Sequence, residues 1–170
     1  MRVKLCVFSD SHGDPAPMLR AIAREEPDLC FYLGDGLADL EPVRRQYPEL
    51  TIHAVRGNCD LRSPLPQTLT CTVEGVTFFA AHGHRCGVKH DPSLEELRAA
   101  GAKAGAHVIL FGHTHEPYLE NRSLPVVLNP GAACGTRPGY GVLVLHQGRI
   151  YAQLKHLGTT EDKPYGTHRI

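Results

Sequence analysis

The sequence predicts an α/β fold in which parallel βαβ units are followed by a second, partly antiparallel sheet. Short apolar runs alternate with amphipathic segments in the first third of the chain, which is typical of parallel strands joined by helices. The pattern then changes, because Pro64 and Pro66 mark an irregular crossing and two apolar runs flank Glu74-Gly75, a hairpin signal. A chain of 170 residues is suited to one domain with one core.

In the first part of the chain, each predicted strand leads into a polar loop. The strands are expected over residues 3–8, 29–33 and 51–55, and the loops are Ser9 to Gly13, Gly34 to Gly36 and Gly57 to Asp60. A helix is expected between Pro17 and Pro27, where apolar residues recur at helical spacing, and another over 38–46. Ligands of parallel βαβ units bind beyond the carboxyl ends of the strands, which is where these loops fall.

A second, partly antiparallel sheet is expected to begin in the second part of the chain. The strands predicted from there onward are 69–73, 76–81, 108–111, 126–128, 141–145 and 150–154. A helix is expected over 93–104, and Gln147-Gly148 predicts a turn. Periodicity is lost from about Lys155 onward, so we expect a single domain over 1–155 and a C-terminal tail over 156–170. His156 and His168 of this tail are therefore not assigned to any site.

The composition favours a cytoplasmic protein and disfavours a dedicated nucleic-acid binder or a membrane protein. The 18 basic and 18 acidic residues balance, so no net charge would steer the protein onto nucleic acid or an anionic membrane. The N-terminal apolar run is too short for a signal peptide, and no apolar stretch reaches the roughly 18 residues of a membrane span. The six cysteines include no C-x-x-C pair and are expected to be reduced. Assembly into a homo-oligomer is left open.

Five loops, each directly after a predicted strand, carry residue types that bind divalent metal ions. They contain Asp10 and His12, Asp35, Asn58, His82, and His113 with His115. Carboxylate and amide oxygens suit magnesium or manganese, whereas imidazole nitrogens suit zinc, iron or manganese. Each pair by itself is more often part of a solvated loop or a turn. The ordered set predicts a metal centre, with Asp35 as the candidate bridge between two ions.

This ordered set resembles the hallmark of the calcineurin-like metallophosphoesterases, which is Asp-x-His, Gly-Asp, Gly-Asn, a histidine-bearing loop and Gly-His-x-His. Three segments are similar to the versions in the small single-domain phosphodiesterase branch: Gly57-Asn58-Cys59-Asp60, His82-Gly83-His84 and Asn129-Pro130-Gly131. The resemblance spans about residues 3–151. It implies a four-layer α-β-β-α sandwich of two mixed sheets flanked by helices.

The resemblance also implies a dinuclear metal centre and a hydrolytic activity. Asp10, His12 and His115 would bind the first ion, Asn58, His82 and His113 the second, and Asp35 both. His82 is preferred to His84 as a ligand because it lies nearer the end of the strand. The expected ions are manganese, with magnesium, zinc, nickel or iron as alternatives. A hydroxide bridging two such ions would attack a phosphodiester, or a phosphomonoester, of a small substrate.

Cys59 departs from the pattern of many larger members of the superfamily, which carry a histidine at this position to protonate the leaving group. A thiol is a weak hydrogen-bond donor, and a thiolate would repel the phosphate or bind a metal. A small buried filler is an equal alternative. We therefore expect either a preference for good leaving groups or a proton supplied by His84 or a metal-bound water. The candidate catalytic residues are Asn58, Cys59 and His84.

Other functions are weighed against this interpretation. A noncatalytic protein-binding scaffold is the main alternative, because the superfamily includes a membrane-trafficking subunit of the same small fold. The full set of expected ligands favours catalysis over the scaffold. A serine hydrolase is disfavoured because Ser9 and Ser11 lack a nucleophile elbow. Asp60 is expected to be a turn residue or to orient a histidine. Arg56 is in reach of a substrate phosphate in one interpretation, and a surface arginine before a turn is the preferred one.

Overall fold

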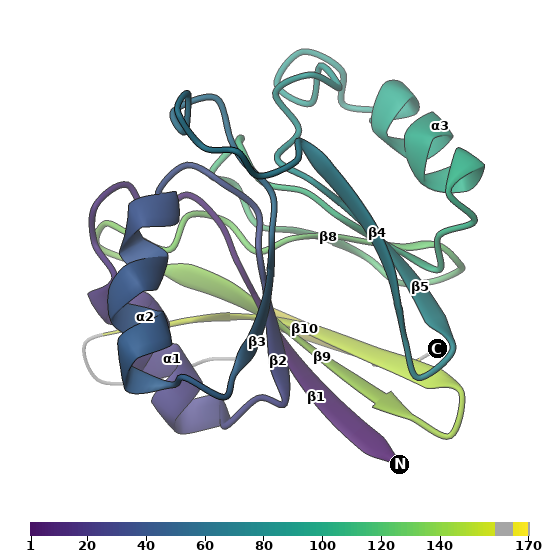
Figure 1. Ribbon diagram of the computed structural model, residues 1–170. Helices are drawn as coiled ribbons and strands as arrows, with labels where there is room; N and C mark the ends of the chain where they lie inside the picture. Colours follow the sequence, from purple (N-terminus) through teal and green to yellow (C-terminus); the bar gives the residue numbers. More distant parts are fainter. Residues whose placement is uncertain (159–164, 170) are drawn as a thin grey trace.

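Two mixed β-sheets pack face to face, with helices on both outer sides, in the computed structural model, which describes residues 1–158 and 165–169 (Figure 1). This is the four-layer α-β-β-α sandwich that the resemblance implied, so the expected fold class is confirmed. Among the described residues, no helix is both long enough and apolar enough to cross a membrane.

Sheet A has six strands in the described part of the chain. They are β1 (Arg2–Phe8), β2 (Leu29–Tyr32), β3 (Thr51–Ala54), β9 (Gly139–His146), β10 (Arg149–His156) and β11 (Tyr165–Arg169). Their order across the sheet is β11-β10-β9-β1-β2-β3. Strands β1, β2 and β3 are parallel, and the remaining neighbours are antiparallel. The carboxyl ends of β1, β2 and β3 therefore lie at the same end of sheet A.

Sheet B combines a hairpin with parallel strands. Its strands are β4 (Thr68–Val73), β5 (Val76–Ala81), β6 (Val108–Leu110), β7 (Tyr118–Glu120) and β8 (Val126–Asn129), in the order β4-β5-β6-β8-β7. Strands β5, β6 and β8 are parallel. Both predicted hairpin turns are confirmed, because Glu74-Gly75 joins β4 to β5 and Gln147-Gly148 joins β9 to β10, each with positive φ at both residues.

The helices cover the outer faces of the two sheets (Figure 1). Helix α1 (Ala16–Glu25) and helix α2 (Leu40–Gln46) lie against sheet A, and helix α3 (Glu95–Lys103) lies against sheet B. Two prolines at the start of α1 suit the first turn of a helix, where the backbone N–H groups have no partner within the helix. The helix predicted over 38–46 is divided into a short 3-10 helix, η1 (Leu37–Asp39), and α2.

The apolar interior is divided by the sheets into three layers rather than forming one core. Leu5, Phe31 and Phe78 lie between the sheets, and the rings of Phe31 and Phe78 stack with centroids 5.0 Å apart. The next residues along β1 and β5, Cys6 and Phe79, face the outer helices, because successive side chains of a strand point to opposite faces. Burial of both faces explains why the central strands are apolar throughout.

Two strands were not predicted from the sequence. Strand β7 has only three residues and pairs with β8, which is too short for an alternating pattern to be recognised. Strand β11 lies within the predicted tail and pairs with β10, so the tail contributes an edge strand to sheet A. Residues 159–164 and 170, and the side chain of His168, lie outside the described part. The domain boundary near residue 155 stays a prediction.

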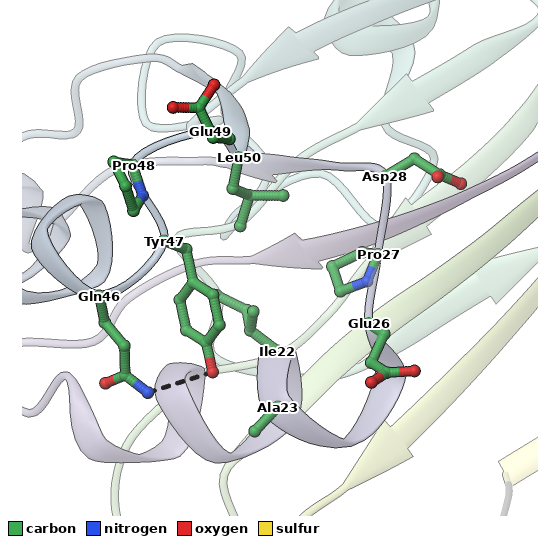
Figure 2. Close-up of a pocket in the computed structure, with 10 residues that line it drawn as sticks. All are labelled: Ile22, Ala23, Glu26, Pro27, Asp28, Gln46, Tyr47, Pro48, Glu49 and Leu50. Atoms are coloured by element: carbon green, nitrogen blue, oxygen red, sulfur yellow. Dashed lines mark hydrogen bonds between the residues drawn. The ribbon is translucent and has the colours of Figure 1, made fainter.

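A surface hollow lies at the amino ends of β2 and β3, between the ends of α1 and α2 (Figure 2). Ile22, Tyr47 and Leu50 supply apolar surface there. Its acidic residues are Glu26, Asp28 and Glu49, and the described residues that line it include no lysine or arginine. Such a hollow would repel a phosphate ester. The candidate metal-binding loops follow the carboxyl ends of the strands and therefore lie at the opposite end of sheet A.

Candidate metal centre

The first group of predicted ligands is formed by loops that follow β1 and β6. Asp10, His12 and His115 each direct a donor atom into one cluster, in which all three atoms lie within 4.8 Å of one another. The Nε2 atoms of His12 and His115 are 3.1 Å apart, and Oδ1 of Asp10 lies 3.2 Å from Nε2 of His115. The structure therefore brings together the three residues expected at the first ion.

The second group surrounds His82 at the end of β5. Its Nε2 atom lies 3.3 Å from Oδ2 of Asp35, 3.1 Å from Oδ1 of Asn58 and 3.1 Å from Nδ1 of His113. Asp35 also shares a cluster with His12, so its carboxylate lies between the two groups, as a bridging residue must. All seven predicted ligands thus converge, although they come from five loops that are distant in the sequence.

The hydrogen bond of His82 to the backbone identifies which ring nitrogen carries the proton. Nδ1 lies 2.7 Å from the carbonyl oxygen of Leu33, and a carbonyl oxygen only accepts, so Nδ1 must be the donor. A neutral ring then has a lone pair on Nε2, facing oxygen atoms of Asp35 and Asn58. In that neutral form, three lone-pair donors face one another and repel unless a cation lies between them, whereas a protonated ring would itself donate to Asp35. This arrangement fits a divalent metal ion.

Asp10 shows the same requirement for positive charge. Its side chain is fully buried, and among the described residues its Oδ1 atom has no hydrogen-bond partner. Three imidazoles surround this atom, those of His12, His82 and His115, at 3.7, 3.9 and 3.2 Å. A buried carboxylate oxygen without a partner is costly, and a metal ion ligated by these side chains would remove that cost. The residues present therefore fit the metal that the resemblance implies.

Burial and neighbouring charges adjust the protonation of two further histidines. Burial, together with the adjacent His82, lowers the pKa of His113 to about 4, so its ring is neutral, as a metal ligand must be. Burial, His82 and Arg85 likewise lower the pKa of His84. The His84 ring lies 5.4 Å from that of His82 and 6.1 Å from that of His113. His84 therefore lies beside the second group rather than in it.

The backbone of the ligand loops is strained. Asp10, His12, Asp35, His113 and His115 all have positive φ, between 47° and 68°. This conformation costs an L-residue roughly 1–2 kcal/mol, and it persists only where surrounding contacts enforce it. The loops also approach closely, because a Cβ atom at Gly57 would lie 2.1 Å from Oδ1 of Asp35. Five of the seven candidate ligands adopt this conformation, which among the described non-glycine residues is also found at Glu26, Glu74, Leu94 and Gln147.

Three polar side chains hold these loops in place. Asp60 accepts hydrogen bonds from four backbone N–H groups, those of Asp35, Gly36, Leu37 and Gly57. Asp60 is thus a turn residue, as expected, and these contacts are to the backbone rather than to a histidine. Asp39 accepts from the hydroxyl of Ser11 and from the N–H of Gly13.

The third of these side chains, Asn129, connects the loop after β6 with the loop after β8. Its Nδ2 group donates to the carbonyl oxygen of Gly112 and to Oγ1 of Thr114, and its Oδ1 accepts from the N–H of Gly131. The sequence marked Asn129 only as part of a motif and gave Asp39 no role. The partners of Asp39, and the Gly112 and Thr114 partners of Asn129, belong to other loops, so no local pattern could have identified these contacts.

Cys59 lies at the edge of the centre and is exposed, so its interpretation as a buried filler is wrong. Its N–H donates to Oδ1 of Asp35 at 2.7 Å, and its Sγ accepts from Nδ2 of Asn58 at 3.4 Å. Desolvation and the adjacent Asp35 raise the pKa of the thiol, which favours its neutral form. Arg56 is half-buried rather than a surface residue, and its guanidinium donates to the carbonyl oxygen of Ser63.

Comparison with known proteins assigns the family. The model of the calcineurin-like phosphoesterase superfamily domain matches residues 3–148. A phosphodiesterase of Methanocaldococcus jannaschii is 33% identical, with 81% of this chain and 88% of that protein covered. Phosphodiesterase YfcE of Escherichia coli strain K12 is 31% identical, with 83% and 87% covered.

Solved structures agree on the fold. A protein of Streptococcus pneumoniae TIGR4, described as a phosphoesterase on the basis of prediction, has a TM-score of 0.73 at 22% identity, with 99% of both chains covered. Vacuolar protein sorting 29 of Cryptosporidium parvum has a TM-score of 0.81 at 15% identity, again with 99% of both covered. The extent of the family match and the identity to the phosphodiesterases show that this chain belongs to the calcineurin-like phosphoesterase superfamily.

Proposed function

We propose that this protein is a phosphodiesterase that depends on two divalent metal ions. The observation that carries the proposal is the set of lone-pair donors around His82, which lie 3.1–3.3 Å from its Nε2 atom. The two similar proteins named as phosphodiesterases support a diester as the substrate. We further propose a small phosphate ester as substrate, manganese as the first ion to test, and the cytoplasm as the place of action.

The residues of the two groups would divide the work of binding between them. Asp10, His12 and His115 would hold one ion, Asn58, His82 and His113 the other, and Asp35 would bind both. When bound, such a pair of ions activates a water molecule and neutralises charge on the phosphate. The buried carboxylates form the floor of the centre, and the imidazoles of His12 and His115 form an exposed rim. A phosphate ester would thus have access from the solvent.

Two side chains beside the second group, Cys59 and His84, are candidates for positioning a ligand and for supplying a proton. The contact of the Asn58 Nδ2 group with the Cys59 sulfur keeps the Asn58 amide oxygen directed at His82. His84 is the titratable group beside the second set of ligands. Its Nδ1 atom is buried without a hydrogen-bond partner among the described residues, although the side chain as a whole is partly exposed. We propose that Cys59 positions Asn58 and that His84 is the residue closest to supplying a proton to the leaving group.

The test is metal-dependent hydrolysis measured alongside metal binding. Bis(p-nitrophenyl) phosphate and p-nitrophenyl phosphate would be assayed with Mn²⁺, Mg²⁺, Zn²⁺ and Ni²⁺, before and after the substitution Asp35→Asn. We expect metal-dependent cleavage of the diester and a loss of both activity and bound metal in the variant. Asp28→Asn, in the hollow of Figure 2, is the matched control and should change neither.

Two results would contradict the proposal. The first is hydrolysis that does not depend on added metal, and the second is equal metal binding by Asp35→Asn and the unaltered protein. Absence of both activity and metal binding would favour the alternative of a noncatalytic protein-binding scaffold.

A further inference from the structure

The ring of His12 has no support of its own within the candidate metal centre. The Nδ1 atom of His82 is fixed by the carbonyl oxygen of Leu33 at 2.7 Å, whereas among the described residues no group bonds to Nδ1 of His12. Its side chain is 33% exposed, and the ring beside it, that of His115, is exposed as well. The position of the His12 ring therefore depends on the backbone that carries it.

That backbone is in an unfavourable conformation. The φ angle of His12 is 47°, in the left-handed region that costs an L-residue roughly 1–2 kcal/mol. The N–H of His12 donates to the carbonyl oxygen of Asp35 at 3.2 Å, which is at the long end of the usual range. One such bond is a weak constraint, so other contacts must maintain the conformation.

A buried cluster of three side chains supplies these contacts on both sides of His12. One oxygen of Asp39, Oδ2, accepts from the Ser11 hydroxyl at 2.5 Å and from the N–H of Gly13 at 2.8 Å. Oγ of Ser11 also lies 2.6 Å from the hydroxyl of Tyr32. The three residues that contribute these side chains are at most 8% exposed. We call Ser11, Tyr32 and Asp39 the His12 clamp.

The direction of each hydrogen bond in the His12 clamp follows from the hydrogens available. A carboxylate only accepts, so the single hydroxyl hydrogen of Ser11 points at Asp39. The Tyr32 hydroxyl must then donate to Oγ of Ser11. Hydrogen bonds to a carboxylate are stronger than neutral ones, and linked hydrogen bonds in a buried site strengthen one another. The chain from Tyr32 to Asp39 is therefore a firm anchor for the backbone next to His12.

The loop that carries Asp35 packs directly onto the His12 clamp. A Cβ atom at Gly36 would lie within 2.8 Å of a polar atom of each of the three clamp side chains, so a glycine is required there. Asp35 has a separate support, because its N–H donates to Asp60. Loss of the His12 clamp should therefore act on His12 before it acts on Asp35.

We propose that the His12 clamp positions His12 and thereby sets the affinity of the centre for its first ion. The inference rests on the proposed function, in which Asp10, His12 and His115 hold one of two ions. Asp39 is not one of the candidate ligands and acts through the backbone of residues 11–13, so it is a positioning residue. Loss of a group that orients a ligand lowers metal affinity about 10–100-fold.

The test measures the affinity of each ion in variants of the clamp. The Mn²⁺-loaded protein would be dialysed against a series of buffered free Mn²⁺ concentrations, and the bound ions would be counted by elemental analysis. In Asp39→Ala we expect the affinity for the first ion to fall at least about tenfold and that for the second to stay unchanged. Asp39→Asn keeps an oxygen acceptor and should restore most of the affinity. Tyr32→Phe leaves the bond between Ser11 and Asp39 and should have a smaller effect.

Asp91→Ala is the matched control for the loss of a carboxylate. Asp91 also accepts a serine hydroxyl and a backbone N–H, but it lies just before α3, away from the centre. A thermal melt should show a loss of stability in both alanine variants, whereas the affinity for the first ion should change only in Asp39→Ala. Ser11→Ala removes a single hydroxyl and provides the same test if Asp39→Ala does not fold.

An unchanged affinity for the first ion in folded Asp39→Ala or Ser11→Ala would overturn the proposal. Equal weakening of both ions would also overturn it, because a general loosening of the centre affects both. Hydrolysis of bis(p-nitrophenyl) phosphate separates this inference from the proposed function. Metal-dependent cleavage with unaltered ion affinities in Asp39→Ala would leave the phosphodiesterase and remove the clamp. The expected loss of the first ion, without any cleavage by the unaltered protein, would leave the clamp and remove the phosphodiesterase. Binding of no ion at all would remove both.

Discussion

The two groups of candidate ligands differ in how far the protein encloses them. In the second group, the side chains of His82 and Asp35 are 0% and 3% exposed, and a carbonyl oxygen fixes the orientation of the His82 ring. In the first group, the side chains of His12 and His115 are 33% and 47% exposed. The Nε2 atoms of His12 and His115 face each other, 3.1 Å apart, on the exposed side of the centre. The second group is thus centred on a buried histidine, with Asn58 at its exposed edge, whereas the first group presents two exposed histidines around the buried Asp10.

This difference indicates different affinities for the two ions. A ligand that packing and hydrogen bonds already hold in place loses little conformational freedom when an ion binds. An exposed side chain must be ordered at that moment, at a cost of about 0.5–1.5 kcal/mol for each one. We therefore expect the second ion to be retained more tightly and the first to exchange with solvent. The following predictions test this comparison from the largest expected effect to the smallest.

Substitution of His82 should have the largest effect. His82→Ala removes the central ligand of the second group and its bond to Leu33, so activity should fall by more than the roughly 10–100-fold that loss of an outer-shell partner causes. Elemental analysis should show the second ion missing. The exposed His146→Ala in strand β9 is the control for loss of a histidine elsewhere. Because His82 is buried, a circular dichroism melt must first show that the variant is folded. A folded variant that keeps both ions would contradict the prediction.

Substitution of His12 should affect only the first group. We expect His12→Ala to bind one ion instead of two and to lose about 10–100-fold in activity, with little change in stability because the side chain is partly exposed. Titration with a chelator, followed by metal analysis, should remove the first ion from the unaltered protein before the second. Simultaneous loss of both ions would show that the enclosure of the two groups does not determine their affinity.

Asp60 should matter for stability through the loops that it connects. Burial alone would raise the pKa of Asp60, but hydrogen bonds from four backbone N–H groups together lower it. A carboxyl with a lowered pKa in the folded state stabilises the protein above the unfolded pKa of about 3.9, and this stabilisation is lost as the pH falls through the folded pKa. Asp60→Asn should therefore cost about 1–3 kcal/mol of unfolding free energy at pH 7.

The pH dependence of that cost distinguishes the carboxylate from the shape of the side chain. Denaturant unfolding at a series of pH values should show the difference between the two proteins shrinking toward pH 3. Asp91→Asn is a positive control for this pH dependence, because the Ser93 hydroxyl and backbone N–H groups also lower the pKa of Asp91, which lies just before α3 and away from the centre. A difference that stays constant with pH would exclude the carboxylate hydrogen bonds as the cause.

The candidate ligands could be predicted from the sequence because each one directly follows a strand. The runs before Asp10, Asp35 and His113 are short and apolar, and the parallel order of β1 and β2 brings their carboxyl ends together. The fold followed from the same regularity. Parallel strands supply the proximity of these loops within each sheet, whereas the expectation that loops of both sheets meet at one centre came from the family resemblance.

The supports of the centre could not be predicted because they depend on contacts between distant segments. Asp39 and Asn129 bond to backbone groups of other loops, and nothing in their own neighbourhoods reveals those partners. His156 was placed in the tail, yet it ends strand β10 and lines a cavity beside His115. The pairing of β10 with β9 determines that position, and a reading of residues 155–170 alone contains no sign of it.

Cys59 and His84 should have the smallest effects, limited to the leaving group. The thiol of Cys59 is held neutral and bonded to Asn58, so it contributes position rather than a proton. Cys59→His would place an imidazole at the exposed edge and should accelerate alkyl esters, whose leaving groups need protonation, more than p-nitrophenyl esters. His84→Ala should slow the alkyl esters selectively. Rates for a series of esters of increasing leaving-group pKa measure this directly, and parallel slopes for both variants and the unaltered protein would show that neither residue assists departure.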